Sequence, residues 1–243
     1  MTTTITVQEA IEKGKGEVSL KGWAYRERKS NAFAFVVLRD DTNIIQCVIK
    51  KEDVSEQIWN DVQKLSVESS LEIEGTLKED KRAPTGYEVQ VKNLTLIHAA
   101  ERFPITKDQS EEFLLDKRHL WIRSRELTAV WKVKAQVLKA CRDFFEEKKF
   151  YEVTPPIITG SSCEGGSTLF EMKYFKDKAY LSQSAQLYLE ALIFSLKKVW
   201  SLTQSFRAEP SKTSRHLTEY WHLEAEAAWM TFAELLKFEE ELI

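Results

Sequence analysis

The sequence predicts two domains, a small β-barrel followed by an α+β domain built on an antiparallel sheet. Residues 1–98 contain short runs typical of strands, separated by polar or glycine-containing turns. Residues 126–149 carry a broad apolar stripe at helical spacing. From Gly160 onward, strand-like and helix-like runs are mixed, which is typical of an α+β domain.

The order of elements in residues 1–98 indicates the type of barrel. Strands are expected at 17–28, 33–40, 44–51, 69–79 and 87–97. Residues 54–65 have apolar side chains three and four positions apart, which predicts a short amphipathic helix. Five strands with a helix between the third and the fourth is the order of an OB-fold barrel, and another small β-barrel is the alternative. OB-fold barrels bind single-stranded nucleic acid with aromatic and cationic side chains.

The remaining chain divides into a linker and the α+β domain. Residues 99–125 are charged, contain Pro104 and lack a sustained period, so we expect a linker or hinge. Residues 126–243 form the second domain. Its expected helices lie at 126–149, 184–196 and 232–243, and its expected strands at 169–175, 179–182, 199–209 and 217–229. Two prolines within 151–160 exclude a helix there and predict an edge strand or extended segment.

The composition indicates a folded protein and excludes several classes. Hydrophobic residues make up 43% of the chain and charged residues 30%, so it is able to bury a core. The net charge of −3 argues against a generally basic nucleic-acid binder but is compatible with a local basic face. Cys47, Cys141 and Cys163 form no CxxC pair, which indicates neither a zinc site nor a disulfide framework. With no signal peptide and no long apolar run, we expect a cytoplasmic protein without a membrane span.

The stretch FRAEPSKTSRHLTEYWHLEAE, residues 206–226, concentrates opposite charges on two expected strands and their loop. Alternate residues of a strand share a face, so Arg207 lies with Glu209, and Glu224 lies with Glu226. Arginines bind phosphate oxygens bidentately, and carboxylates bind Mg²⁺ or a base amino group, which fits a nucleotide site. The alternative is a solvated hairpin with weak ion pairs. A GxxxxGK[ST] or GxGxxG loop does not occur, so a nucleotide site here would be of another kind.

These motifs resemble those of class II aminoacyl-tRNA synthetases, in particular the aspartyl, asparaginyl and lysyl subgroup. FRAE, RHL-x-E and the acidic strand after them resemble motif 2. The helix at 126–149 and the following FYEVTPPI resemble motif 1, with Pro156 at its signature proline, and this implies a homodimer. LKGWAYRERKSNAFAFVVLRDDTNIIQCVI resembles the OB-fold anticodon-binding domain of the subgroup, so the resemblance spans essentially the whole chain.

Three stretches, RHLWIRS, SSCEGG and LSQSAQLYLE, resemble the asparaginyl branch of the subgroup. Aspartyl members usually carry a lysine that holds the substrate carboxylate at the position of Leu189. Here Glu190 follows that leucine, and a carboxylate would accept from an amide NH₂ and repel aspartate, although a solvated glutamate is the alternative. The resemblance therefore implies ATP-dependent activation of asparagine to asparaginyl-adenylate and transfer to tRNA(Asn) for protein synthesis. The alternatives are the same reaction with aspartate, and a non-catalytic RNA-binding fragment of a synthetase.

The resemblance also implies roles for individual residues. Arg207 would bind the ATP α-phosphate and neutralise the charge that builds in the transition state. The positions for ATP are Arg207, Glu209, Arg215, His216 and Leu217, and those for the amino acid are Glu164, Gln186, Leu189, Glu190 and Arg207. The positions for the tRNA anticodon are Arg28, Phe35 and Gln46, and either Glu224 or Glu226 is the candidate for Mg²⁺. We expect Phe33 to be a core residue and Cys163 to be a loop residue without chemistry.

Motif 3 of the family, a Gly-rich strand and helix with an arginine over ATP, does not occur before Ile243. The acidic metal-binding stretch that precedes motif 3 is missing too. We therefore expect this chain to be the front part of a longer protein and to be inactive in aminoacylation by itself.

Overall fold

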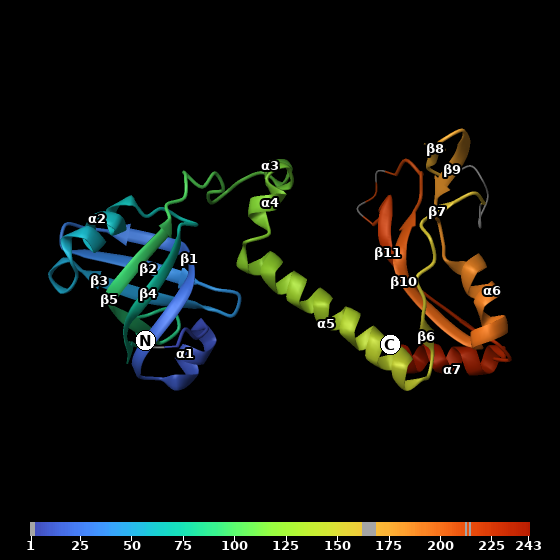
Figure 1. Cartoon of the computed structure of the whole chain (residues 1–243), viewed down its shortest axis with the longest axis horizontal. Coiled ribbons are helices and arrows are strands. Elements are labelled where there is room, and N and C mark those ends of the chain that lie inside the picture. The colour runs from blue at the N-terminus through green and yellow to red at the C-terminus, as the bar shows by residue number, and fades with distance from the viewer. Residues whose placement is uncertain (1–2, 162–168, 212, 214) are drawn as a thin grey trace. The chain divides into compact units, whose positions relative to one another are not determined.

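The computed structural model describes residues 3–161, 169–211, 213 and 215–243. The chain divides into two compact units, Met1–Ile122 and Arg123–Ile243. Figure 1 shows the elements of both units along the chain.

The first unit contains a closed five-stranded barrel with the strand order β1-β2-β3-β5-β4. The strands are β1 (Gly16–Lys29), β2 (Phe33–Arg39), β3 (Ile44–Lys50), β4 (Ser70–Glu79) and β5 (Tyr87–His98). Neighbouring strands are antiparallel except β3 and β5, which are parallel. A short 3-10 helix (Lys51–Asp53) and α2 (Glu56–Lys64) connect β3 to β4. The predicted OB-fold order of five strands and one helix is therefore confirmed.

Helix α1 (Val7–Lys13) precedes the barrel and was not predicted. Thr6 and Glu9 form a capping box at its start, because each side chain accepts from the backbone N–H of the other. Val7 and Ala10 are fully buried against the barrel core. The Thr-x-x-Glu pattern is a recognisable sign of a helix start, so this helix was within reach of sequence reasoning.

The face of β2 that carries the large phenylalanine side chains points out of the barrel, and the face with smaller side chains points into the core. Ala34, Val36 and Leu38 have no exposed surface, whereas Phe33 is 41% and Phe35 is 38% exposed. The prediction that Phe33 is a core residue is therefore wrong. Both faces of β2 are apolar, and the smaller side chains fit the interior of a narrow barrel.

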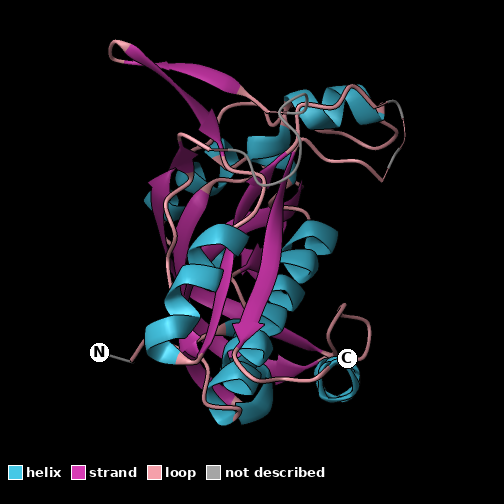
Figure 2. Cartoon of the chain, turned by 90° about the vertical axis from the view of Figure 1, so that its right-hand side faces the viewer, coloured by secondary structure: helices cyan, strands magenta, loops and turns pink. Residues whose placement is uncertain are grey.

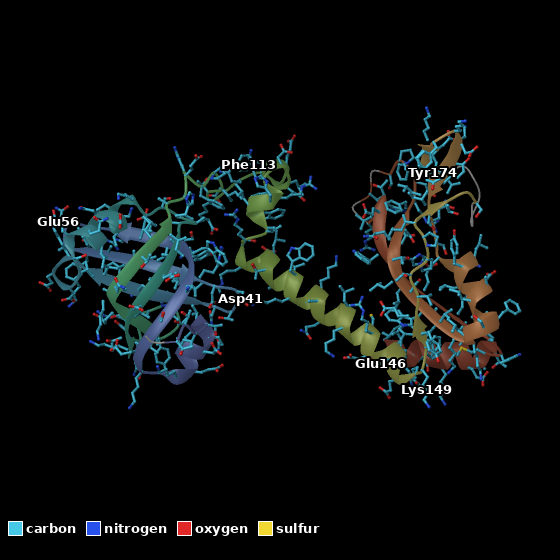
Figure 3. The ribbon with its side chains drawn as sticks, in the orientation of Figure 1. Asp41, Glu56, Phe113, Glu146, Lys149 and Tyr174 are labelled. Carbon is cyan, nitrogen blue, oxygen red and sulfur yellow. The ribbon has the colours of Figure 1, made fainter. Side chains whose placement is uncertain are left out.

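The second unit contains two antiparallel hairpins and confirms the α+β class. In the main sheet, β10 (Lys198–Phe206) lies between β11 (Glu219–Ala227), which is antiparallel, and the short parallel β6 (Tyr151–Glu152). A smaller sheet has the order β7 (Ile158–Thr159), β9 (Asp177–Leu181) and β8 (Glu171–Tyr174). Figure 2 shows these strands in magenta, and Tyr174, labelled in Figure 3, lies at the end of the β8–β9 hairpin.

Helices cover both faces of the main sheet. On one face, α6 (Gln186–Leu196) packs Ala185, Leu189 and neighbouring residues against Val199 of β10. On the other face, α5 (Arg125–Glu147) and α7 (Phe232–Leu242) pack aromatic side chains against Trp200. Two short helices, α3 (Glu111–Asp116) and α4 (Arg118–Trp121), lie within the segment for which we expected only a linker. None of the helices in the described residues is long and apolar enough to cross a membrane.

Candidate functional site

A cavity of about 370 Å³ lies at the loop end of the β10–β11 hairpin, where the polar loop joins the two strands. Its lining residues are Arg207, Glu209, Ser211, Arg215, His216, Leu217, Thr218 and Tyr220. All five positions predicted for ATP are among them. Sequence reasoning missed Ser211, Thr218 and Tyr220, which reach the same cavity through the geometry of the loop and the second strand.

Arg207, which directly follows β10, is held in this cavity by two bonds to the β11 side of the hairpin. Its main-chain N–H donates to the carbonyl of Thr218 at 3.0 Å, which extends the pairing of β10 and β11 by one bond. Its guanidinium Nε donates to the Tyr220 hydroxyl at 3.2 Å. The guanidinium fork carries five N–H donors in a fixed planar geometry. Together with Arg215 it provides cations for an anionic ligand such as a polyphosphate.

Glu224 connects β11 to the start of α6. Its carboxylate accepts from the main-chain N–H of Ala185 at 2.9 Å and from the Ser184 hydroxyl. The start of α6 has no side-chain cap of its own, so Glu224 satisfies an N–H group that the helix leaves unpaired. A carboxylate at a helix N-terminus is also favoured by the helix dipole. Sequence reasoning missed this link because the partners are 39 and 40 residues apart.

Three carboxylates gather where α6 faces β11. Burial raises the pKa of Glu226, and the nearby charges of Glu190 and Glu224 raise it further. The Gln186 amide donates to Glu190 at 2.8 Å, so two of the three α6 residues predicted for the amino acid are joined to each other. A group of like charges favours a ligand that brings a cation or several N–H donors. This carboxylate group, defined by Glu190, Glu224 and Glu226, is the second part of the candidate site.

Two of the residues predicted to bind the amino acid, Leu189 and Glu164, do not belong to this carboxylate group. Leu189 is fully buried in the apolar cluster between α6 and β10. Leu189, predicted as an amino-acid position, therefore lies beneath the carboxylates of the candidate site in this structure. Glu164, and likewise Cys163, lie outside the described residues.

Glu226 gives a testable pH dependence of stability. Its folded-state pKa lies above the ordinary value of 4.5, so the folded chain holds this proton more tightly than the unfolded chain. Protonation of Glu226 therefore stabilises the folded state below the ordinary pKa of 4.5, and this stabilisation is lost as the pH rises through the folded pKa. We expect Glu226→Gln to raise the urea midpoint relative to the parent at about pH 7 and to leave it unchanged at about pH 4. Glu219→Gln, on an exposed residue of the same strand, is the control, and an equal effect of Glu226→Gln at both pH values would contradict the prediction.

The barrel carries a separate cavity of about 330 Å³ at the β1–β2 turn. It is lined by Arg28, Lys29, Ser30, Phe33 and Phe35. Arg28 and Phe35 were predicted for the anticodon and lie here together. Gln46, the third predicted residue, is not in this lining, and its amide donates to Glu88 of β5 at 3.1 Å. An open cavity with two half-exposed aromatic rings and two cations has the chemistry that single-stranded nucleic acid requires.

The comparisons with known proteins agree with both parts of this fold. Residues 110–243 match the family of class II tRNA synthetases for aspartate, lysine and asparagine, and residues 18–97 match the OB-fold nucleic-acid-binding domain. The chain belongs to this class II tRNA synthetase family.

The similar proteins point to one branch of that family. An asparagine–tRNA ligase from Thermococcus gammatolerans is 55% identical over 226 residues, covering 93% of this chain and 52% of the relative. One from Thermoplasma acidophilum is 50% identical over 227 residues, covering 93% and 53%. The crystal structure of asparaginyl-tRNA synthetase from Pyrococcus horikoshii with asparaginyl-adenylate has a TM-score of 0.92 and 48% identity, covering 100% of this chain and 57% of that one. The chain thus spans about half the length of the curated relatives it matches.

Proposed function

We propose that the protein containing this chain activates asparagine with ATP and transfers it to tRNA(Asn) in the cytoplasm. The observation that carries the proposal is the cavity of the β10–β11 hairpin, where two arginines and a histidine lie together. The similarity to asparagine–tRNA ligases supports asparagine as the amino acid. The carboxylate group on α6 and β11 supports a substrate with an ammonium and an amide.

The proposed chemistry requires positioning and electrostatics, without a nucleophile from the protein. The carboxylate oxygen of asparagine attacks the α-phosphorus of ATP, a new P–O bond forms, and the bond to pyrophosphate breaks. Arg207 neutralises the charge that builds on the pentacoordinate phosphorus. Arg215 and His216 hold the β- and γ-phosphates, and Glu209 contacts the adenine amino group. In the second step, the hydroxyl at the 3′ end of the tRNA attacks the acyl carbon and AMP leaves.

The same arrangement accounts for the choice of asparagine over aspartate. A carboxylate accepts hydrogen bonds and donates none when ionised, so it pairs with the amide NH₂ of asparagine. The side-chain carboxylate of aspartate would meet Glu190, Glu224 and Glu226 at close range and be repelled. The low polarity beneath them, where Leu189 takes the place of a lysine, leaves that repulsion uncompensated.

Mg²⁺ fits this site as a companion of the ATP phosphates. The part of the chain that the structure describes holds no group of three or more metal-ligating side chains. Glu224 and Glu226 are the candidate ligands: Glu224 already accepts hydrogen bonds on both oxygens, and Glu226 pairs with Val199 at the end of the hairpin away from the cavity. Mg²⁺ usually binds through one or two carboxylates together with substrate phosphates, and it would neutralise phosphate charge.

ATP–pyrophosphate exchange in the full-length protein tests the proposal. We expect exchange that depends on asparagine and is much weaker with aspartate. Exchange with aspartate alone would show an aspartate–tRNA ligase. Absence of exchange with either amino acid would favour a non-catalytic RNA-binding protein.

The barrel cavity supports a role in binding the anticodon loop, with Phe35 stacking on a base. Stacking of a base on an aromatic side chain contributes about 1–3 kcal/mol. We therefore expect Phe35→Ala to weaken binding of an RNA stem-loop with the asparagine anticodon by about tenfold or more. Fluorescence anisotropy measures the affinity, and Phe175→Ala, on an exposed ring of the second unit, is the control. Equal affinities of Phe35→Ala and the parent would remove Phe35 from the RNA site.

Gln46 supports the same role less directly, since its amide is engaged by Glu88. We propose that it reaches the central uridine of the anticodon by exchanging that partner. Gln46→Ala is then expected to weaken tRNA charging by the full-length protein. Unchanged dependence of charging on tRNA concentration would remove Gln46 from the site.

Helix α5 supports a homodimer. Val130, Trp131, Val133 and Val137 are each more than half exposed. Figure 3 shows side chains standing out along this helix, and Glu146 marks the end where α5 reaches the core of the second unit. An apolar stripe of this length is typical of a surface that another protein covers. Sedimentation of the full-length protein tests the proposal, because Trp131→Glu is expected to yield monomers and an unchanged mass would contradict it.

A further inference from the structure

The ammonium group of Lys29, the last residue of β1, is bound to the backbone of α2. Its Nζ donates to the carbonyl of Gln63 at 3.1 Å and also to the carbonyl of Leu65. Both carbonyls lie at the C-terminal end of α2, where helical carbonyls lack partners and the helix dipole favours a cation. The side chain is only 19% exposed, and the Glu27 carboxylate lies 3.7 Å from Nζ. The Lys29 ammonium is therefore bound by acceptors that belong to the barrel unit itself.

The same residue opens the turn that forms the barrel cavity. The Ser30 N–H donates to the Phe33 carbonyl at 2.8 Å, and the Phe33 N–H donates to the Ser30 hydroxyl at 3.1 Å. These bonds fix the turn internally. The N–H of Lys51, the residue that follows β3, also donates to the Ala32 carbonyl of the turn at 3.0 Å. Lys29 adds the link between this turn and α2.

A lysine beside Arg28 in a nucleic-acid cavity would ordinarily be assigned to a phosphate. The contacts of Nζ argue otherwise, because moving it to a phosphate would leave two helix-end carbonyls without their donor. The geometry points to a different role. We propose that Lys29 is a positioning residue that ties the β1–β2 turn to α2 and so fixes Arg28, Phe33 and Phe35 for RNA. This inference rests on the proposed RNA-binding function of the barrel.

Lys64 provides a matched control. It stands between the two carbonyl residues that Lys29 contacts, and its side chain is 60% exposed. Its Nζ pairs with Asp61 of the same helix at 2.8 Å. Lys64→Met thus removes one positive charge from the same end of α2 without touching the link to the turn. Lys29→Met removes both the charge and the link.

The test uses the full chain and an RNA stem-loop in which one base of the asparagine anticodon is replaced by fluorescent 2-aminopurine. Stacking on an aromatic ring quenches this base, so its fluorescence at saturating protein reports how the bound base is held. For Lys29→Met we expect an affinity about tenfold lower at every salt concentration, with an unchanged salt slope and weaker quenching in the bound state. Lys29→Arg, which retains donors for both carbonyls, is expected to keep the quenching of the parent. Lys64→Met is expected to leave the quenching unchanged.

Three results would overturn the inference, each in a recognisable way. A salt slope smaller by about 0.7 with full quenching in the bound state would show that Lys29 binds a phosphate. A lower urea midpoint with unchanged affinity and quenching would show a merely structural role. Absence of binding and quenching in the parent chain would remove the proposed RNA function and this inference with it. If Lys29→Met does not fold, Lys29→Gln keeps one uncharged donor and supports the same measurements.

Discussion

Replacing Arg207 by alanine in the full-length protein is expected to lower kcat/KM for asparagine-dependent ATP–pyrophosphate exchange by about 10³-fold or more. The magnitude follows from arginines that stabilise phosphoryl-transfer transition states. In this chain the guanidinium is anchored by the Tyr220 hydroxyl at 3.2 Å and lies in the hairpin cavity. Because the charge it opposes builds in the transition state, the loss is expected mainly in kcat, with a smaller change in KM for ATP.

Two further variants separate the charge of Arg207 from its orientation. Arg207→Lys keeps a positive charge but not the planar fork, so it is expected to recover only part of the activity. Tyr220→Phe removes the hydroxyl that accepts from Nε and keeps the ring, so we expect a loss of about tenfold or less. Activity of Arg207→Ala within a few-fold of the parent would remove Arg207 from the catalytic role, and circular dichroism would establish that the variant is folded.

The hairpin part of the candidate site was predictable from the sequence because it is local. Arg207, Glu209, Arg215 and His216 all lie in the segment between β10, which ends at Phe206, and β11, which begins at Glu219, so closeness along the chain is enough to bring them to one cavity. The barrel was predictable for the same reason, since the order of its strands and its helix is readable along the chain. The resemblance to a known family then indicated ATP as the ligand to propose, which the charges alone left open.

The features that sequence reasoning missed depend on contacts between distant segments or on a choice between similar faces. The bonds of Glu224 to Ser184 and Ala185 join β11 to α6 and have no local signature. Phe33 and the strand residues beside it are apolar on both faces, so the pattern does not show which face enters the barrel. Leu189 was singled out from the family resemblance, but the sequence does not show that its side chain is buried between α6 and β10.

Replacing Trp200 by alanine is expected to destabilise the second unit, because Trp200 packs beneath the β10–β11 hairpin. Trp200 of β10 is 2% exposed and stacks on Phe145 of α5 with ring centroids 4.6 Å apart and an interplanar angle of 6°. Truncating a buried tryptophan costs about 3–5 kcal/mol, because it removes buried surface and leaves a cavity. Urea unfolding followed by the helical circular dichroism signal, which arises mainly from α5, α6 and α7, measures the loss.

The control for this prediction is another tryptophan of the same unit. Trp229 is 86% exposed, and its ring lies 5.5 Å from the ammonium of Lys197. An exposed pair of this kind contributes about 0.5–1 kcal/mol, so Trp229→Ala is expected to change the stability by no more than that. Equal effects of the two substitutions would contradict the role of Trp200. Trp200 packs on the sheet face opposite α6, and Arg207 follows the end of β10, so the loss of Trp200 acts on Arg207 only through this strand. We therefore expect the activity of the full-length protein, measured well below the unfolding midpoint, to persist.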